Sequence, residues 1–147
     1  MLPFPEIEIQ KQLELHEGKR SKVYKDTVGK LTVGIGRNIS DIPFSDDEIA
    51  LMFSNDIKRS MHDLDQIAKW WRDLDSVRQR VLLDMCFNLG ATRLSAFVNT
   101  LKAIQQGRYE DAARGMEQSK WYSQVGNRAK RLVEMMRTGR LPSELMD

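Results

Sequence analysis

The chain has 147 residues, of which 41% are hydrophobic and 30% are charged, and its formal net charge is +2. This length suits one domain, or one domain with two lobes, that can bury a core of its own. The composition is that of an ordinary soluble globular protein, and no apolar run reaches membrane-spanning length. The N-terminal residues lack the basic and apolar regions of a signal peptide, so we expect the protein to stay in the cytoplasm.

Charge is unevenly distributed along the chain. Residues 1–50 hold seven Lys or Arg against nine Asp or Glu, whereas residues 101–140 hold nine against four. A basic C-terminal part suits a bacterial envelope or nucleic acid, and it is equally typical of a plain solvated surface. Cys86, the single cysteine, lies in an apolar run and is predicted to be buried and inert. The sequence has neither a zinc-ligand spacing nor a phosphate-binding glycine loop, so no metal or cofactor is expected.

The first predicted elements are a helix and a β-hairpin. The helix opens at Pro5 and ends before Gly18, a residue type suited to a helix C-terminus. Residues 26–29 form a turn signal between two short runs rich in β-branched and aromatic residues. We therefore predict that residues 22–25 and 31–35 pair as strands.

Helices are predicted for most of the remaining chain. A short connection, residues 37–43, has room for one further edge strand. Ser45 and Glu48 then form a capping box, which predicts a helix that runs to about Met61. Helical periodicity and glycine stops predict the later helices at residues 76–89, 94–106, 109–118 and 127–138. The fold class is therefore α+β, mainly α.

The hairpin carries the first candidate functional residues. Side-chain alternation predicts a core face in the second strand, with Leu31, Val33 and Ile35. The opposite face carries Thr32 with Gly34 and Gly36 and is nearly bare. Glycine weakens a strand, and one reason for its presence is the close approach of a ligand. Thr32 is then expected to be a lone hydroxyl in an open groove.

Two carboxylates flank this hairpin. Glu17 is the last residue before Gly18, so its side chain should project from a helix end toward the hairpin, where Asp26 approaches from the turn. Two carboxylates held apart around a groove suit glycosidic bond hydrolysis, because one can protonate the leaving oxygen while the other activates water. Taken singly, each residue is better explained as a solvated acid or a turn-former.

Together, Glu17, Asp26 and Thr32, at separations of nine and six residues, resemble the catalytic signature of the T4-type phage lysozymes. The resemblance covers roughly residues 13–139 and is carried by further segments in the family's order, at residues 75–78, 85–90, 97–101, 119–122 and 127–131. It implies a lysozyme-like, two-lobed fold with a cleft between the lobes. Residues 1–147 would form a single lysozyme domain made of a hairpin lobe, a connecting helix and a helical lobe, at about 13–45, 46–62 and 63–141.

The resemblance also implies a role for each matching residue. Glu17 matches the general acid, Asp26 the carboxylate that orients or activates water, and Thr32 the hydroxyl that helps to hold that water. The family inverts at the anomeric carbon, which implies that the two carboxyl groups lie roughly 6.5–9.5 Å apart. Three residues match substrate-binding positions in the family: Phe87, Thr100 and Arg128. Of these, the arginine reaches toward the catalytic glutamate across the cleft.

Two residues depart from the family pattern. Arg37 stands where the family has a histidine that pairs with an acid on the following helix, and Asp56 matches that acid. We predict an ion pair between Arg37 and Asp56, which would keep its charge at pH values where histidine loses it. Gly115 stands where the family has an asparagine, which implies fewer side-chain hydrogen bonds to substrate. The connection after Arg37 is also shorter, so the N-terminal lobe should be smaller.

The function implied by the resemblance is hydrolysis of the β-1,4 bond between N-acetylmuramic acid and N-acetylglucosamine in peptidoglycan. The protein would then be a monomeric phage endolysin that acts on the host wall, needs no metal and takes no nucleic acid as partner. Because no export signal is present, access to the wall would depend on a membrane-permeabilising partner such as a holin.

Three other interpretations stay open at this stage. A lytic transglycosylase would use Glu17 alone and form an anhydro product, which makes Asp26 and Thr32 dispensable. A non-catalytic module could bind nucleic acid or the envelope through the basic residues 127–140. The basic C-terminal helices could also disturb an anionic membrane directly, as an activity additional to hydrolysis.

Overall fold

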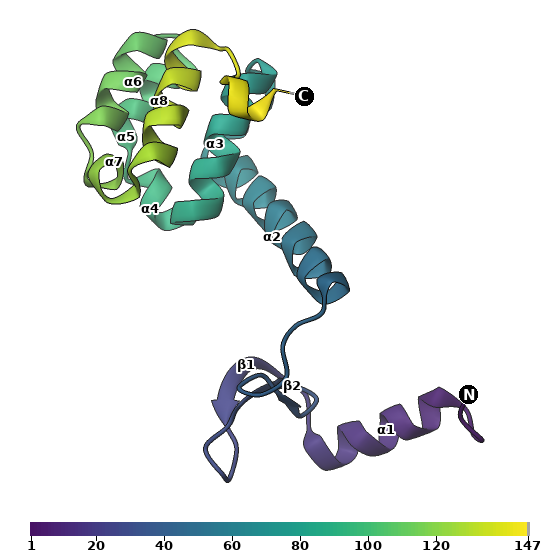
Figure 1. The fold of residues 1–147 in the computed structure, drawn as a ribbon. Coiled ribbons are helices and arrows are strands. Elements are labelled where there is room, and N and C mark those ends of the chain that lie inside the picture. Colours follow the sequence, from purple (N-terminus) through teal and green to yellow (C-terminus); the bar gives the residue numbers. More distant parts are fainter. Residues whose placement is uncertain (147) are drawn as a thin grey trace. The chain divides into compact units, whose positions relative to one another are not determined.

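A computed structural model describes residues 1–146 of the chain (Figure 1). Backbone contacts divide the chain into two compact units, Met1–Leu51 and Met52–Asp147. The division falls inside the long helix α2 (Asp46–Ile67). Among the described residues, no helix combines the length and the apolar character needed to cross a membrane.

The first unit is a helix followed by a three-stranded antiparallel sheet (Figure 1). It comprises α1 (Glu6–Glu17), β1 (Arg20–Lys25), β2 (Leu31–Gly34) and β3 (Arg37–Asn38), with strand order β1-β2-β3. These elements confirm the predicted helix, hairpin and edge strand. In the central strand, Thr32 pairs with Tyr24 on one side and with Asn38 on the other.

The two faces of β2 differ from the prediction. Thr32 is only 3% exposed, whereas Leu31 and Ile35, on the predicted core face, are 42% and 43% exposed. Three short strands cannot cover an apolar face by themselves, which agrees with the exposure of Leu31 and Ile35. The prediction of a lone Thr32 hydroxyl in an open groove is therefore wrong, because the residue is largely covered within this unit.

Helix α2 begins with the predicted capping box. The Glu48 backbone N–H donates to Ser45 Oγ at 3.2 Å, and the Ser45 backbone N–H donates to Glu48 Oε1 at 2.8 Å. Both groups would otherwise be unpaired donors at the helix start. The helix continues to Ile67, beyond the predicted end near Met61, and a short 3₁₀ turn, η1 (Lys69–Asp73), follows.

The second unit is helical (Figure 1). Its further elements are α3 (Ser76–Leu89), α4 (Ala91–Ser95), α5 (Val98–Gln105), α6 (Tyr109–Glu117), α7 (Lys120–Val125), α8 (Asn127–Thr138) and η2 (Ser143–Leu145). Helix α6 packs against both α5 and α8, and α3 also packs against α8. The predicted bounds of α3 and α8 are confirmed. The predicted helix 94–106 is instead broken into α4 and α5 at Phe97, which leaves the helical conformation and packs edge-to-face on Trp121.

The core of this unit is built from side chains that share near-complete burial. They include four methionines, Met85, Met116, Met135 and Met136, which fill the space between the helices. Cys86 is also buried, and its thiol donates to the Ser60 carbonyl oxygen at 3.6 Å. Burial raises the pKa of this thiol to about 11, and the prediction of a buried cysteine is confirmed.

Arg78 links α3 to the end of α8 through hydrogen bonds. Its Nε donates to the Met136 carbonyl oxygen at 2.7 Å, and a terminal nitrogen donates to the Arg137 carbonyl oxygen at 3.2 Å. The guanidinium also lies 3.5 Å from the ring centroid of Tyr109. The last carbonyls of a helix have no partner within the helix, so this arginine satisfies two of them.

Candidate active site

Glu17 is placed by the end of α1. Gly18 takes a positive φ of 77°, and its N–H donates to the Glu14 carbonyl oxygen at 2.9 Å, which closes the helix. The Glu17 side chain then extends over Gly36: a Cβ built at position 36 would lie 2.6 Å from Glu17 Oε2 and 2.8 Å from its Cδ. The carboxylate therefore packs on bare backbone just after β2, as expected for a helix-end acid facing the hairpin.

Asp26 is placed by the hairpin turn. Its Oδ1 accepts hydrogen bonds from the backbone N–H groups of Val28 at 2.9 Å and Lys30 at 2.8 Å. The Asp26 backbone N–H donates in turn to the Lys30 carbonyl oxygen at 2.9 Å. This side-chain mimic of a backbone turn is the reason an aspartate suits the position. Within residues 1–146 the hydrogen bonds of this carboxylate all go to Oδ1, which leaves Oδ2 able to accept a proton.

The backbone of Lys30 joins Asp26 to Thr32. The Thr32 hydroxyl donates to the Lys30 carbonyl oxygen at 3.1 Å, and the N–H of Lys30 holds Asp26 Oδ1. Because its proton is committed to the carbonyl, the hydroxyl oxygen retains lone pairs that can accept a hydrogen bond from a water molecule. The Lys30 side chain pairs with Asp41 at 3.2 Å, which anchors the turn to the segment after β3.

The first unit therefore holds all three residues predicted to be catalytic. Glu17 reaches the hairpin through its contact with Gly36, while Asp26 and Thr32 share the backbone groups of Lys30. A carboxylic acid, a fixed carboxylate and an oriented hydroxyl are the groups needed for acid-assisted attack of water on a glycosidic bond. The sequence did not predict that Lys30 links Asp26 to Thr32. Lys30 does so through its backbone N–H and C=O, which every residue type except proline carries, so its side chain gives no indication of this role.

Arg37 and Asp56, between which an ion pair is predicted, lie in different units, and each is paired within its own unit, so that ion pair stays a prediction. Arg37 binds Glu48 in a bidentate pair, with NH1 donating to Oε1 at 3.1 Å and NH2 donating to Oε2. Asp56 instead pairs with Arg59 at 2.7 Å, one turn along α2. The physical reason is proximity, because the capping box already holds Glu48 at the start of α2, next to β3. The Arg37 hydrogen bonds lower the pKa of Glu48 to about 2.

In the second unit, Phe87 and Arg128 line the same pocket of about 500 Å³. The Phe87 ring is exposed and stacks edge-to-face on Phe53, with centroids 5.9 Å apart. Arg128 Nε donates to Asp84 Oδ1 at 2.8 Å, so the guanidinium is held by an acid of its own unit. Asp84 was not predicted as a site residue. Thr100 lies elsewhere, on α5, with its side chain beside Gly115 of α6.

Comparison with known proteins places the chain in a family. The sequence profile described as phage lysozyme matches residues 14–138, which include all three candidate catalytic residues. The chain belongs to the phage lysozyme family. Membership agrees with the mainly helical α+β fold and with the resemblance carried by the sequence motifs.

Similar proteins come from Dictyostelium discoideum and from phages. A probable T4-type lysozyme 1 of Dictyostelium discoideum is 25% identical over 90% of this chain and 95% of its own length. The pre-baseplate central spike protein Gp5 of Enterobacteria phage T4 is 28% identical over 95% of this chain, which spans 29% of that protein. The peptidoglycan hydrolase gp36 of Pseudomonas phage phiKMV is 27% identical over 86% of this chain and 15% of its length.

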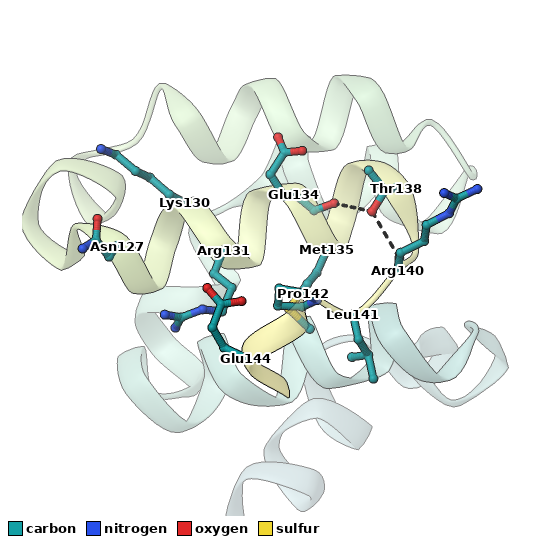
Figure 2. A pocket seen from close by; sticks show the side chains of 10 residues that line it. All are labelled: Asn127, Lys130, Arg131, Glu134, Met135, Thr138, Arg140, Leu141, Pro142 and Glu144. Carbon is teal, nitrogen blue, oxygen red and sulfur yellow. Dashed lines mark hydrogen bonds between the residues drawn. The ribbon is translucent and has the colours of Figure 1, made fainter. Parts of the chain in front are cut away.

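The basic C-terminal segment lines a separate pocket of about 460 Å³ between α8 and the residues that follow it (Figure 2). Figure 2 shows Lys130 and Arg140 at opposite ends, and Met135 between them. Two carboxylates, Glu134 and Glu144, belong to the same lining, so the pocket is mixed in charge. Across residues 1–146, no group of three or more metal-ligating side chains is arranged to hold an ion.

Proposed function

We propose that this chain is an N-acetylmuramidase that cleaves the β-1,4 bond between N-acetylmuramic acid and N-acetylglucosamine in peptidoglycan, with inversion. Membership of the phage lysozyme family and the similarity to a phage peptidoglycan hydrolase support the substrate. The observation that carries the proposal is the hairpin itself, which joins Asp26 to Thr32 through Lys30 and packs its end against Glu17.

In the proposed reaction, Glu17 enters protonated and gives its proton to the glycosidic oxygen as the bond to the anomeric carbon breaks. A water molecule attacks that carbon from the opposite face, and Asp26 Oδ2 accepts the proton that the water loses. Thr32 accepts a hydrogen bond from the same water and orients it. The products are a reducing muramic end and a free hydroxyl on the glucosamine, and proton exchange with solvent restores both carboxyl groups.

The geometry of Asp26 supports its proposed role as the base. Two backbone N–H groups hold Oδ1, so the carboxylate cannot rotate freely and Oδ2 keeps one direction. A positioned base of this kind contributes about 10²- to 10⁴-fold to a rate. A transglycosylase, in which a hydroxyl group of the sugar attacks, has no use for this arrangement.

The proposed biological role is host lysis by a monomeric phage endolysin, with access to the wall provided by a membrane-permeabilising holin. Phe87, Thr100 and Arg128 are proposed to bind the glycan. In the structure Arg128 is held by Asp84 at 2.6 Å, which fixes the guanidinium before substrate arrives. The nucleic-acid alternative draws no support from the C-terminal pocket, because its cations are interspersed with carboxylates.

Mass spectrometry of fragments released from purified peptidoglycan tests the proposal. Wild-type protein should release fragments with reducing muramic ends, and Glu17→Gln should release none. Glu14→Gln is the matched control, because it neutralises an exposed acid of the same helix and should leave the fragments unchanged. Anhydro-muramic ends would indicate a transglycosylase, and a complete absence of fragments would leave only a binding module.

A further inference from the structure

The turn that follows β3 folds back onto β2. The Ile39 backbone N–H donates to the Leu31 carbonyl oxygen at 2.8 Å, and the Leu31 backbone N–H donates to Ser40 Oγ at 2.9 Å. Both backbone groups of Leu31 are therefore bound by residues 38–41, here named the 38–41 turn. The residue that they bind is the one that directly follows Lys30 in the chain.

The Asp41 carboxylate connects the 38–41 turn to the hairpin. Its Oδ2 accepts a hydrogen bond from Asn38 Nδ2 at 2.9 Å, and the Asp41 backbone N–H donates to Asn38 Oδ1 at 3.2 Å. The Lys30 ammonium donates to Asp41 Oδ1 at 3.2 Å. The hydrogen bonds from Asn38 and Lys30 lower the pKa of this carboxyl group below its usual value, so the group is charged at neutral pH.

Lys30 is the residue through which this contact reaches Asp26. The Lys30 backbone N–H donates to Asp26 Oδ1 at 2.8 Å, and its carbonyl oxygen accepts from the Asp26 N–H at 2.9 Å and from the Thr32 hydroxyl at 3.1 Å. Asp41 binds the ammonium of the same residue, and Ser40 binds the N–H that follows it in the chain. The 38–41 turn therefore limits the movement of the backbone groups that hold Asp26 and Thr32.

Apolar burial contributes little to the position of the hairpin turn. Val28, at its tip, is 77% exposed, and both Asp26 and Lys30 are only half-buried. A small sheet without a covered apolar face is marginal by itself. The position of the turn therefore depends on its hydrogen bonds and on the ion pair between Lys30 and Asp41.

This ion pair is better suited to positioning than to stability. Its two side chains are 45% and 54% exposed, and exposed ion pairs add little to the free energy of unfolding. A reacting group, in contrast, can lose about 100-fold in rate when it is displaced by about 1 Å. Loss of the pair should therefore affect a reaction at Asp26 more than it affects folding.

We propose that Asp41 is a positioning residue for the base: it binds the Lys30 ammonium and, together with Asn38 and Ser40, holds the Lys30 backbone that orients Asp26. The inference rests on the function proposed above, in which Asp26 accepts the proton of the attacking water. Asp41 acts through Lys30 and takes no part in the chemical step itself.

Steady-state kinetics of wall hydrolysis test this role. Asp41→Ala removes the carboxylate and Lys30→Met removes the ammonium, while the backbone groups stay. Each variant should lower kcat about 5- to 20-fold and leave KM and the melting temperature close to those of the wild type. Lys30→Arg keeps the charge and the reach and should retain at least about half of the wild-type kcat. Asp47→Ala, which removes an exposed acid of the same unit, is the matched control and should not change the rate.

Double variants distinguish positioning from a general structural role. Lys30→Met combined with Asp41→Ala should lower kcat no further than either change alone, because both remove one interaction. In an Asp26→Asn protein, the addition of Asp41→Ala should change the residual rate by less than about 2-fold, because the base that it orients is gone. An unchanged kcat for Asp41→Ala, or an undiminished effect in the Asp26→Asn protein, would overturn the inference.

Amide hydrogen exchange, measured by NMR, tests the contact without any catalysis. The N–H groups of Val28 and Lys30, which donate to Asp26, should exchange at least about 5-fold faster in Asp41→Ala than in the wild type or in Asp47→Ala. Unchanged exchange would overturn the inference. Faster exchange in a protein that releases no wall fragments would support the contact and refute only the proposed hydrolysis.

Discussion

The carboxylate of Glu17 packs directly on the backbone of Gly36, at a distance that no side chain at position 36 would permit. This contact joins the end of α1 to the residue that follows β2. Gly36 also takes a positive φ of 70°, a conformation that glycine adopts without strain. Position 36 therefore requires glycine for two independent reasons, the positive φ and the close contact with the Glu17 carboxylate. Only the second reason concerns the proposed acid.

Gly36→Ala should separate these two demands when compared with Gly34→Ala. Both glycines have a φ near +70°, but a Cβ at position 34 meets no atom within 4 Å. Each alanine should lower the free energy of unfolding by about 1–2 kcal/mol through backbone strain. Only Gly36→Ala should also reduce wall hydrolysis about 100-fold or more, because it displaces the Glu17 carboxylate. Equal losses of activity in the two variants would show that the contact is unimportant.

Asp26→Asn should abolish the proposed base while keeping the turn. The asparagine oxygen can still accept the N–H groups of Val28 and Lys30, so the melting temperature should change little. The rate of fragment release should fall about 10²- to 10⁴-fold. Asp26→Ala removes the turn as well and should lower both the rate and the stability. An active Asp26→Asn protein would exclude this carboxylate as the base.

Thr32→Ser and Thr32→Val should differ in activity. Serine keeps the hydroxyl that donates to the Lys30 carbonyl oxygen, whereas valine keeps the shape and removes the hydroxyl. Because Thr32 is buried, valine should leave that carbonyl with one partner fewer and cost about 1 kcal/mol of stability. Steady-state rates of wall hydrolysis should fall at least about 10-fold for valine and much less for serine. Equal rates in the two variants would indicate a purely structural threonine.

Acid should weaken the first unit through Glu48. Its pKa is about 2 in the folded protein, below the usual value near 4.5, because Arg37 and the Ser45 N–H stabilise the charged form. The contribution of this carboxylate is therefore present in full above about pH 5 and is lost as the pH falls toward 2. Urea unfolding from pH 6 to pH 2.5 should show the wild-type advantage over Glu48→Gln shrinking. Asp47→Asn, a neighbouring acid of the first turn, should not reproduce this pH dependence.

Arg78→Lys should destabilise the second unit although it keeps the charge. Lysine cannot reach two carbonyl oxygens at the end of α8 and stack on Tyr109 at the same time. The loss should be about 1–3 kcal/mol, as for hydrogen bonds made by a charged group. Arg93→Lys, an exposed arginine of α4, is the control and should change stability by less than about 0.5 kcal/mol. Chemical denaturation of both variants gives the comparison.

The sequence by itself determined the elements that depend on local signals. The Ser45 capping box, the strands around the 26–29 turn, and the helices that end at Gly90 and Gly139 were all predictable, because caps, turns and periodicity act over a few residues. The candidate acid, base and hydroxyl were also named before the structure, through the resemblance of their residue types and spacing to the family's catalytic signature. Their roles stay predictions until the variants above are measured.

Only the tertiary structure decided which groups meet. It buried Thr32 at the centre of the sheet, paired Arg37 with Glu48, and broke the predicted helix at Phe97. It also placed Gly115 against the Thr100 hydroxyl. These outcomes depend on distances between residues far apart in the chain and on backbone groups such as those of Lys30, which every residue type carries alike. The pattern of side chains along the sequence therefore does not predict these contacts, because burial and pairing depend on how the elements pack.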